Sequence, residues 1–207
     1  MRIITFERNG TVQHGIRNGE MVQLCPDAKS AADLAMNGAP SSDEAVALSE
    51  VKLLPPVPRP GKIICIGLNY RAHAIEGGNA IPDYPAVFMR CTTSLAAPDA
   101  ALIYPECSDT FDYEAELAVV IGKTATAVSA ADALDYVAGY CCFNDGSVRD
   151  YQRKSTQWTM GKNFDGTGGF GPELVTPDEL PAGASGLRLV ARLNGEIMQD
   201  SDTGDMI

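Results

Sequence analysis

The stretch FDYEAELAVVIG, residues 111–122, decides how we interpret this chain. Its second half is strongly apolar, which predicts a β-strand that runs into the protein core. Side chains of a strand alternate between its two faces, so Glu114 and Glu116 share a face with their Cα atoms about 6.5 Å apart. Two carboxylates this close repel each other. Either one of them binds a proton at a raised pKa, or a cation lies between them.

Two interpretations of this pair stay open. From spacing alone, two glutamates on the solvent face of an edge strand are the simpler reading. Asp145, at the end of a predicted strand over residues 140–144, could supply a third oxygen ligand, although a plain turn aspartate is equally common there. A set of oxygen ligands favours Mg²⁺, Mn²⁺ or Ca²⁺ over zinc. We therefore treat Glu114, Glu116 and Asp145 as candidate metal ligands.

Composition narrows the class of protein. The 207 residues carry a formal net charge of −11 and contain no basic cluster, which argues against nucleic-acid binding. No stretch reaches the roughly 18 apolar residues that a membrane span needs, and residues 1–10 show no signal-peptide pattern. The six cysteines lack CxxC spacing and suggest reduced, structural thiols. We expect a cytoplasmic protein that does not bind membranes.

The chain divides near residue 56. Residues 1–25 predict short strands with turns at Asn9-Gly10 and Asn18-Gly19, which are typical of hairpins in a small antiparallel sheet. Residues 27–46 are Ala-rich and predict partial helix. The proline-dense stretch LLPPVPRPG, residues 53–61, interrupts regular structure. We expect a small N-terminal subdomain over 1–56 and a catalytic domain over 57–207.

The second part predicts a β-rich α+β domain, because its strands are many and short and its helices few. The expected elements are a buried strand at 62–68, a helix at 71–77, strands at 87–89, 112–121 and 140–144, a helix at 129–137 with Ser129 as N-cap, a glycine-rich loop at 161–171, and a hairpin from 187–193 turning at Asn194-Gly195.

A second pair of residues suggests proton transfer. His73 and Glu76 are three positions apart in a predicted helix, so they lie on one face within hydrogen-bonding reach. A carboxylate beside an imidazole raises its basicity, as a water-activating pair requires. A solvated ion pair on a surface helix is the alternative. The other histidine, His14, lies in the small subdomain, so His73 is the candidate base.

Three further polar residues could contact a substrate. Lys162 lies in the glycine-rich stretch, where its ammonium group could meet an anion, but the phosphate-binding pattern GxxxxGK[ST] is absent and we exclude nucleotide binding. Arg149 and Gln152 could line the same pocket. For Arg149, a structural ion pair with a nearby acid is an equally good interpretation.

Taken together, these motifs resemble the fumarylacetoacetate hydrolase family in order and spacing. The resemblance covers roughly residues 60–207 and rests on GLNYRAHAIE at 67–76, DYEAELAVVIG at 112–122, ND at 144–145, RDYQ at 149–152 and GKNFD at 161–165 with Gly171-Pro172. It implies a β-roll or sandwich, a homodimer, and a divalent cation, Mg²⁺ above all and Mn²⁺ or Ca²⁺ as alternatives. By position the resemblance implies the ligands Glu114, Glu116 and Asp145.

The resemblance also implies roles and reactions. His73 and Glu76 match a water-activating pair, and Lys162 with Gln152 matches residues that contact the substrate or its enolate. The expected activity is hydrolysis of a carbon–carbon bond in a 1,3-dioxo acid such as an acylpyruvate or fumarylpyruvate. A 2-hydroxyhepta-2,4-diene-1,7-dioate-type isomerase, an oxaloacetate decarboxylase and a non-catalytic metal- or ligand-binding module are the alternatives. Members usually continue well past Met206-Ile207, so we expect a C-terminally shortened chain.

Overall fold

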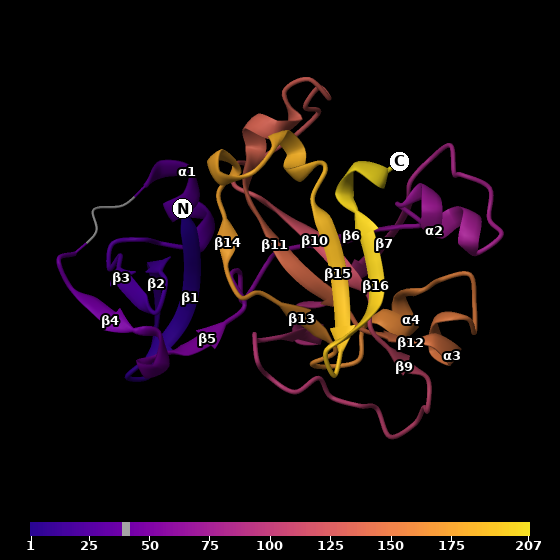
Figure 1. Cartoon of the computed structure of the whole chain (residues 1–207), viewed down its shortest axis with the longest axis horizontal. Coiled ribbons are helices and arrows are strands. Elements are labelled where there is room, and N and C mark those ends of the chain that lie inside the picture. The colour runs from indigo at the N-terminus through magenta and orange to yellow at the C-terminus, as the bar shows by residue number, and fades with distance from the viewer. Residues whose placement is uncertain (39–41) are drawn as a thin grey trace.

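One ten-stranded sheet runs through most of the protein in the computed structural model, which describes residues 1–38 and 42–207. Its strand order is β4-β3-β2-β1-β14-β11-β13-β8, with β10 added to β11 and β5 added to β1 (Figure 1). The strands are β1 (Arg2–Arg8), β2 (Thr11–Asn18), β3 (Met21–Leu24), β4 (Ala45–Ala47), β5 (Lys52–Leu54), β8 (Leu95–Ala96), β10 (Ala115–Ile121), β11 (Val137–Asp145), β13 (Gly168–Phe170) and β14 (Leu174–Val175).

Three two-stranded sheets and four short α-helices complete the described fold, so the predicted β-rich α+β class is confirmed. The paired strands are β6 (Ile63–Gly67) with β7 (Ala86–Arg90), β9 (Phe111–Asp112) with β12 (Ser147–Val148), and β15 (Arg188–Leu193) with β16 (Glu196–Asp202). The helices are α1 (Ala31–Asn37), α2 (Arg71–Glu76), α3 (Arg149–Gln152) and α4 (Thr159–Lys162). No helix of the described residues is long and apolar enough to span a bilayer.

The predicted hairpins form. Asn9 and Gly10 connect β1 to β2 with φ angles of 53° and 73°, the left-handed backbone that a two-residue turn requires. Asn194 and Gly195 do the same between β15 and β16. The third turn lies one residue later than expected, because Asn18 still pairs with Met21. Of the helix expected over 27–46, α1 forms behind the N-cap Ser30, and residues 39–41 lie outside the described part.

Three expectations about the second part are wrong. The strand at 62–68 is not buried on both faces: it pairs only with β7 in the described sheet, and Ile64 remains 59% exposed. The helix at 129–137 is replaced by turns and a 3-10 turn over Ala133–Tyr136. There Ser129 accepts a hydrogen bond from the Asp132 backbone N–H and donates to its carboxylate, which closes a local turn instead.

The glycine-rich stretch is the third correction, because it is ordered structure and not a loop throughout. Its first residues end helix α4, and β13 forms from Gly168 onwards. Gly161 allows α4 to pack closely against α3, because a Cβ at residue 161 would lie only 2.6 Å from Cα of Gln152. Lys162 is therefore held on a helix that packs closely against α3, and its side chain is buried.

Strand β14 joins the two parts of the chain. It pairs with β1 through Ile3 and Leu174, and with β11 through Tyr140 and Val175. Ile3 and Leu174 also share a fully buried cluster with Leu34 of α1. Figure 1 shows the N-terminal strands on one side of this junction and the remaining sheet on the other. The boundary near residue 56 stays a prediction about independent units, since the sheet itself crosses it.

Candidate functional site

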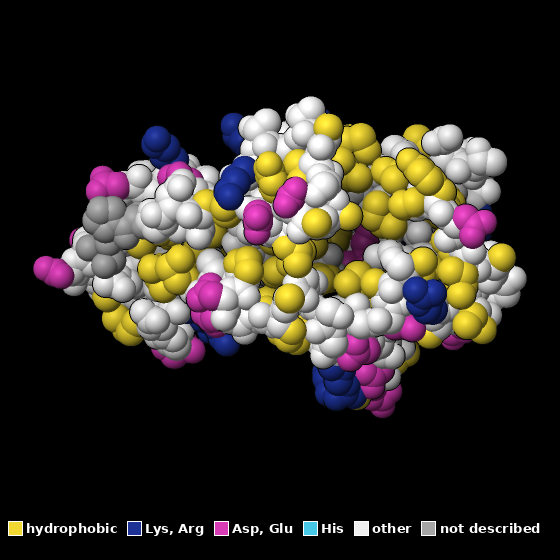
Figure 2. Space-filling view, turned by 90° about the horizontal axis from the view of Figure 1, so that it is seen from above, with side chains coloured by type: hydrophobic (Ala, Val, Ile, Leu, Met, Phe, Trp, Pro, Cys, Tyr) yellow, Lys and Arg dark blue, Asp and Glu magenta, His cyan; other side chains and the backbone are white. Residues whose placement is uncertain are grey.

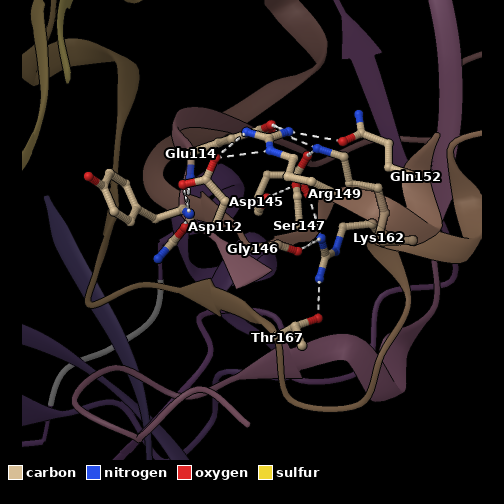
Figure 3. A network of polar contacts seen from close by, with 12 residues as sticks. Asp112, Glu114, Asp145, Gly146, Ser147, Arg149, Gln152, Lys162 and Thr167 are labelled. Atoms are coloured by element: carbon tan, nitrogen blue, oxygen red, sulfur yellow. Dashed lines mark hydrogen bonds and ion pairs between the residues drawn. The ribbon is translucent and has the colours of Figure 1, made fainter. Parts of the chain in front are cut away.

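The candidate site is built where β10 begins and β11 ends. The two strands are antiparallel neighbours with Ala115 opposite Asn144, so Glu114 and Asp145 lie side by side at this end of the pair. The backbone N–H of Asp145 donates to the carbonyl of Glu114 at 2.9 Å. Figure 3 shows both carboxylates converging with the cationic side chains of neighbouring elements.

Lys162 links the two carboxylates. Its Nζ donates to Oε2 of Glu114 and to Oδ2 of Asp145, both at 2.7 Å. The lysine side chain is only 3% exposed and also lies 5.2 Å from the centre of the Phe88 ring. A buried ammonium group is tolerated only when it is paired in this way. The helix α4 thus delivers a fixed positive charge between two acids.

Arginine side chains hold the outer oxygens of the same acids. Arg149 donates to Oε1 of Glu114, to Oδ2 of Asp112 at 3.0 Å and to Oε1 of Gln152 at 3.0 Å. The guanidinium of Arg149 is thereby engaged as a structural partner, one of its two predicted roles. Nε2 of Gln152 donates to no other residue in the part of the chain that the structure describes. Both residues come from α3, which begins directly after the short strand β12.

Arg90 is the site residue that sequence reasoning missed. Arg90 is the last residue of β7, and its side chain is fully buried. It donates to Oδ1 of Asp145 at 2.5 Å and to Oγ1 of Thr167 at 3.0 Å. Both carboxylate oxygens of Asp145 therefore have a cationic partner, Arg90 for Oδ1 and Lys162 for Oδ2. The available signal was an arginine closing the apolar run AVFMR. A guanidinium on the inner face of a strand needs a buried acid as partner.

Glu116 is the third predicted carboxylate and has no cationic partner among the ion pairs of the described residues. Burial, and then the charges of Glu114 and Asp145, raise the pKa of Glu116 to about 7, while Lys162 acts in the opposite direction. A bound proton and a bound cation, the two outcomes that the sequence left open for crowded carboxylates, would each relieve this repulsion.

The charges of the cluster do not balance when Glu116 is ionised. Four carboxylates (Asp112, Glu114, Glu116 and Asp145) then stand against three cations (Arg90, Arg149 and Lys162). Within residues 1–38 and 42–207, no three His, Cys, Asp or Glu side chains are arranged closely enough to hold a metal ion as they stand. Lys162 takes the position between Glu114 and Asp145.

His73 and Glu76 both lie on α2, as expected, and both are exposed. In the described chain, no hydrogen bond or ion pair joins their side chains to each other or to the carboxylate cluster. The root of α2 does approach the cluster: burial, and then the charges of Glu116 and Asp205, raise the pKa of Tyr70 to about 12. The Tyr70 phenol, directly before α2, therefore lies within the electrostatic influence of Glu116.

One face of the molecule is hollowed near its middle. Figure 2 shows acidic side chains at the bottom of a depression whose rim is mostly hydrophobic. A rim of this kind excludes water from part of a small ligand while the polar floor orients it.

Two protein families match parts of this chain. Residues 62–207 match the family described as fumarylacetoacetate (FAA) hydrolase C-terminal. The chain belongs to the fumarylacetoacetate hydrolase family. Residues 1–56 match a separate family described as Rv2993c-like, N-terminal.

Relatives in this family give a more specific comparison. Oxaloacetate tautomerase Fahd2a, mitochondrial, from Rattus norvegicus is 39% identical over 188 residues, which cover 90% of this chain and 60% of the rat protein. Oxaloacetate tautomerase YisK from Bacillus subtilis is 44% identical over 164 residues, covering 77% of this chain and 54% of its own length. The chain spans little more than half the length of these relatives.

Solved structures share the fold of this fumarylacetoacetate hydrolase family member. The crystal structure of 2-hydroxyhepta-2,4-diene-1,7-dioate isomerase from Mycobacterium marinum superposes with a TM-score of 0.84 at 28% identity. The match covers all of this chain and 76% of the isomerase chain.

Proposed function

We propose that this chain carries the active site of a divalent-cation-dependent enzyme that interconverts the keto and enol forms of a small 2-oxo dicarboxylic acid of the oxaloacetate type. Support comes from the two oxaloacetate tautomerases at 39% and 44% identity. The single observation that carries the proposal is the buried ammonium group of Lys162, fixed 2.7 Å from both Glu114 and Asp145.

A keto–enol interconversion needs a fixed positive charge where the enolate oxygen develops. In a buried site such a charge acts more strongly than in water and needs no rearrangement during the reaction. Lys162 supplies it from α4. Gln152 supplies a further contact: its Oε1 accepts from Arg149, so its Nε2 remains to donate to a substrate oxygen.

A divalent cation belongs to the proposal, with Mg²⁺ as the expected ion and Mn²⁺ or Ca²⁺ as alternatives. We assign Glu114, Glu116 and Asp145 as its ligands, because their donor set is all oxygen and the cluster carries one uncompensated negative charge when Glu116 is ionised. When bound, such an ion would polarise two oxygens of a chelating 2-oxo acid.

His73 is the proposed acid–base group. A ring nitrogen of His73 takes the proton from the carbon beside the keto group and delivers it to the enolate oxygen, which gives the enol, and the reverse transfer regenerates the keto form, while Glu76 orients the imidazole through the other ring nitrogen. Both side chains are exposed, and neither has a hydrogen-bond or ion-pair partner in the described chain, so both are accessible to a ligand.

Hydrolysis of a carbon–carbon bond in an acylpyruvate or fumarylpyruvate is the second candidate. The observation that favours it is the spacing of His73 and Glu76 on one short helix, which suits activation of a water molecule as well as a carbon acid. The decarboxylase and the isomerase use the same pocket and stay alternatives. The homodimer and the cytoplasmic location also stay predictions.

The test follows the fate of each substrate. Enol-oxaloacetate is monitored by its ultraviolet absorbance, with Mg²⁺ or Mn²⁺ present and after chelation, and acylpyruvates are assayed for pyruvate release. Cation-dependent loss of the enol that is abolished in His73→Ala supports the tautomerase. Pyruvate from acylpyruvates would move the assignment to the hydrolase, and carbon dioxide from oxaloacetate to the decarboxylase. Cation binding without turnover of any substrate would indicate a binding module.

A further inference from the structure

Glu114 lies between β9 and β10 and belongs to neither strand. Its side chain receives Lys162 and Arg149, so the direction of its carboxylate depends on how the backbone of residues 113–115 is held. Because Glu114 lies outside both strands, regular β-sheet hydrogen bonds do not hold its backbone on both sides.

Side-chain amides replace that ladder. On one side, Glu114 donates its N–H to Oδ1 of Asn144 at 3.1 Å and accepts the Asp145 N–H through its carbonyl. On the other side, Gln199 accepts the Ala115 N–H at 2.8 Å and donates its Nε2 to the carbonyl of Tyr113 at 3.3 Å. One carboxamide thus makes the two bonds that a residue of a parallel neighbouring strand would make around Glu114.

Gln199 is well placed to keep this contact. It is half-buried in β16, opposite Ala191, and the hairpin of β15 and β16 lies over β10, with β15 in contact with that strand (Figure 1). Its neighbours Met198 and Asp200 are exposed, so Gln199 is the residue that β16 turns inward at this level. An inward polar side chain on an otherwise exposed strand needs an internal partner, and the backbone around Glu114 provides it.

We propose that Gln199 is a positioning residue, which orients the carboxylate of Glu114 through the backbone on either side of it. The inference rests on the proposed function, in which Glu114 is a ligand of the divalent cation. Residues that orient metal ligands without touching the metal typically change its affinity by about 10- to 100-fold when they are replaced.

The test uses Gln199→Met, which keeps the length of the side chain and removes both hydrogen bonds. Gln13→Met, a half-buried glutamine of β2 in the N-terminal subdomain, is the matched control. Hydrogen exchange of the Ala115 amide measures the backbone contact directly, and calorimetric titration with Mn²⁺ measures cation affinity. Circular dichroism and thermal unfolding show whether each variant is folded at the temperature of the titration.

We expect Gln199→Met to exchange the Ala115 amide about five- to tenfold faster and to bind Mn²⁺ about tenfold more weakly, with Gln13→Met unchanged in both. Gln199→Asn is expected to behave like Gln199→Met in both measurements, because its side chain is one methylene too short to reach the backbone around Glu114. An unchanged exchange rate would overturn the backbone contact. Faster exchange with unaltered Mn²⁺ affinity would overturn the positioning role alone. A wild-type protein without Mn²⁺ affinity would overturn the proposed function and that role together, whereas the exchange rate would still decide the contact.

Discussion

Lys162 is the residue whose removal should change the site most. Its ammonium group is buried and pairs with Glu114 and Asp145, so Lys162→Met leaves two crowded carboxylates without their shared cation. Breaking a buried ion pair from one side costs about 3 to 5 kcal/mol. We expect the free energy of unfolding, measured with urea in the presence of a chelator, to fall by about 3 kcal/mol.

Added Mg²⁺ should restore part of that stability in Lys162→Met and stabilise it more than it stabilises the wild type, since the cation then meets carboxylates that have lost the counter-charge of Lys162. Lys52→Met, an exposed lysine of β5, is the control and should stay within about 0.5 kcal/mol of the wild type. Equal stability of Lys162→Met and wild type without cation would contradict the ion pairs described here.

His14 supplies a pH-dependent contribution to stability away from the site. Burial lowers the pKa of His14 below its ordinary value of 6.5. The Thr5 hydroxyl donates to the Pro56 carbonyl at 2.8 Å, so the His14 Nδ1–H is the donor in its 3.0 Å bond to Thr5 Oγ1. The folded state therefore favours the neutral imidazole with its proton on Nδ1.

Because the folded pKa is the lower one, the unfolded chain binds more protons below pH 6.5, and stability is lost as the pH falls. We expect the free energy of unfolding to fall more in the wild type than in His14→Asn between about pH 7.5 and about pH 5.5. The asparagine amide can still donate to Thr5 but does not titrate. Parallel pH profiles for the two proteins would rule out this contribution.

At the scale of the element, α2 depends on a residue far along the chain. The helix has six residues and Tyr70 gives it no side-chain cap, but Asp205 accepts the Ala72 N–H at 2.8 Å. The Ile207 N–H also donates to the Asn69 carbonyl at 2.9 Å. Helices this short are marginal on their own, so α2 is held by the residues that follow β16.

Asp205→Ala should therefore loosen α2. Loss of a helix cap costs about 1 kcal/mol, which corresponds to about fivefold faster amide exchange over the helix. Hydrogen exchange followed by mass spectrometry on the peptide that carries His73 measures the change. Asp205→Asn keeps an acceptor oxygen and should exchange nearly as the wild type does. Identical exchange in all three proteins would show that α2 is stabilised elsewhere.

At the scale of the whole molecule, stability depends on β14, the strand that joins the N-terminal hairpins to the sheet of the site. Gly139 of β11 faces it without a side chain, and a Cβ at this position would lie 2.5 Å from the Val175 carbonyl oxygen and 2.9 Å from Leu174. The close approach of β14 and β11 therefore requires glycine at residue 139.

Gly139→Ala should push the two strands apart and lower the free energy of unfolding by about 2 kcal/mol. Gly61→Ala is the matched control, because a Cβ there meets nothing within 4 Å, and we expect a change within about 0.5 kcal/mol. Urea unfolding followed by the fluorescence of the single tryptophan, Trp158, measures both variants. Equal midpoints would show that the junction tolerates a wider spacing.

The sequence by itself determined the local features. Two of the three Asn-Gly pairs predicted to form hairpin turns, at residues 9–10 and 194–195, adopt left-handed backbone and turn where they stand, and the apolar runs become strands because alternating side chains can bury one face. The order and spacing of the motifs were enough to predict the family, which the match over residues 62–207 confirms. Local chemistry sufficed because each of these features depends on neighbours a few residues away.

Only the tertiary structure decided which charges meet. Lys162, Arg149 and Arg90 come from three separate elements and converge on Glu114 and Asp145, and nothing in their local sequence states which acid each one will pair with. Gln199 and Ala115, which share a hydrogen bond, are 84 residues apart in the sequence. Asp205 and Ala72, which share another, are 133 residues apart. Such pairings depend on strand register and on how the hairpins pack, and these are properties of the whole fold.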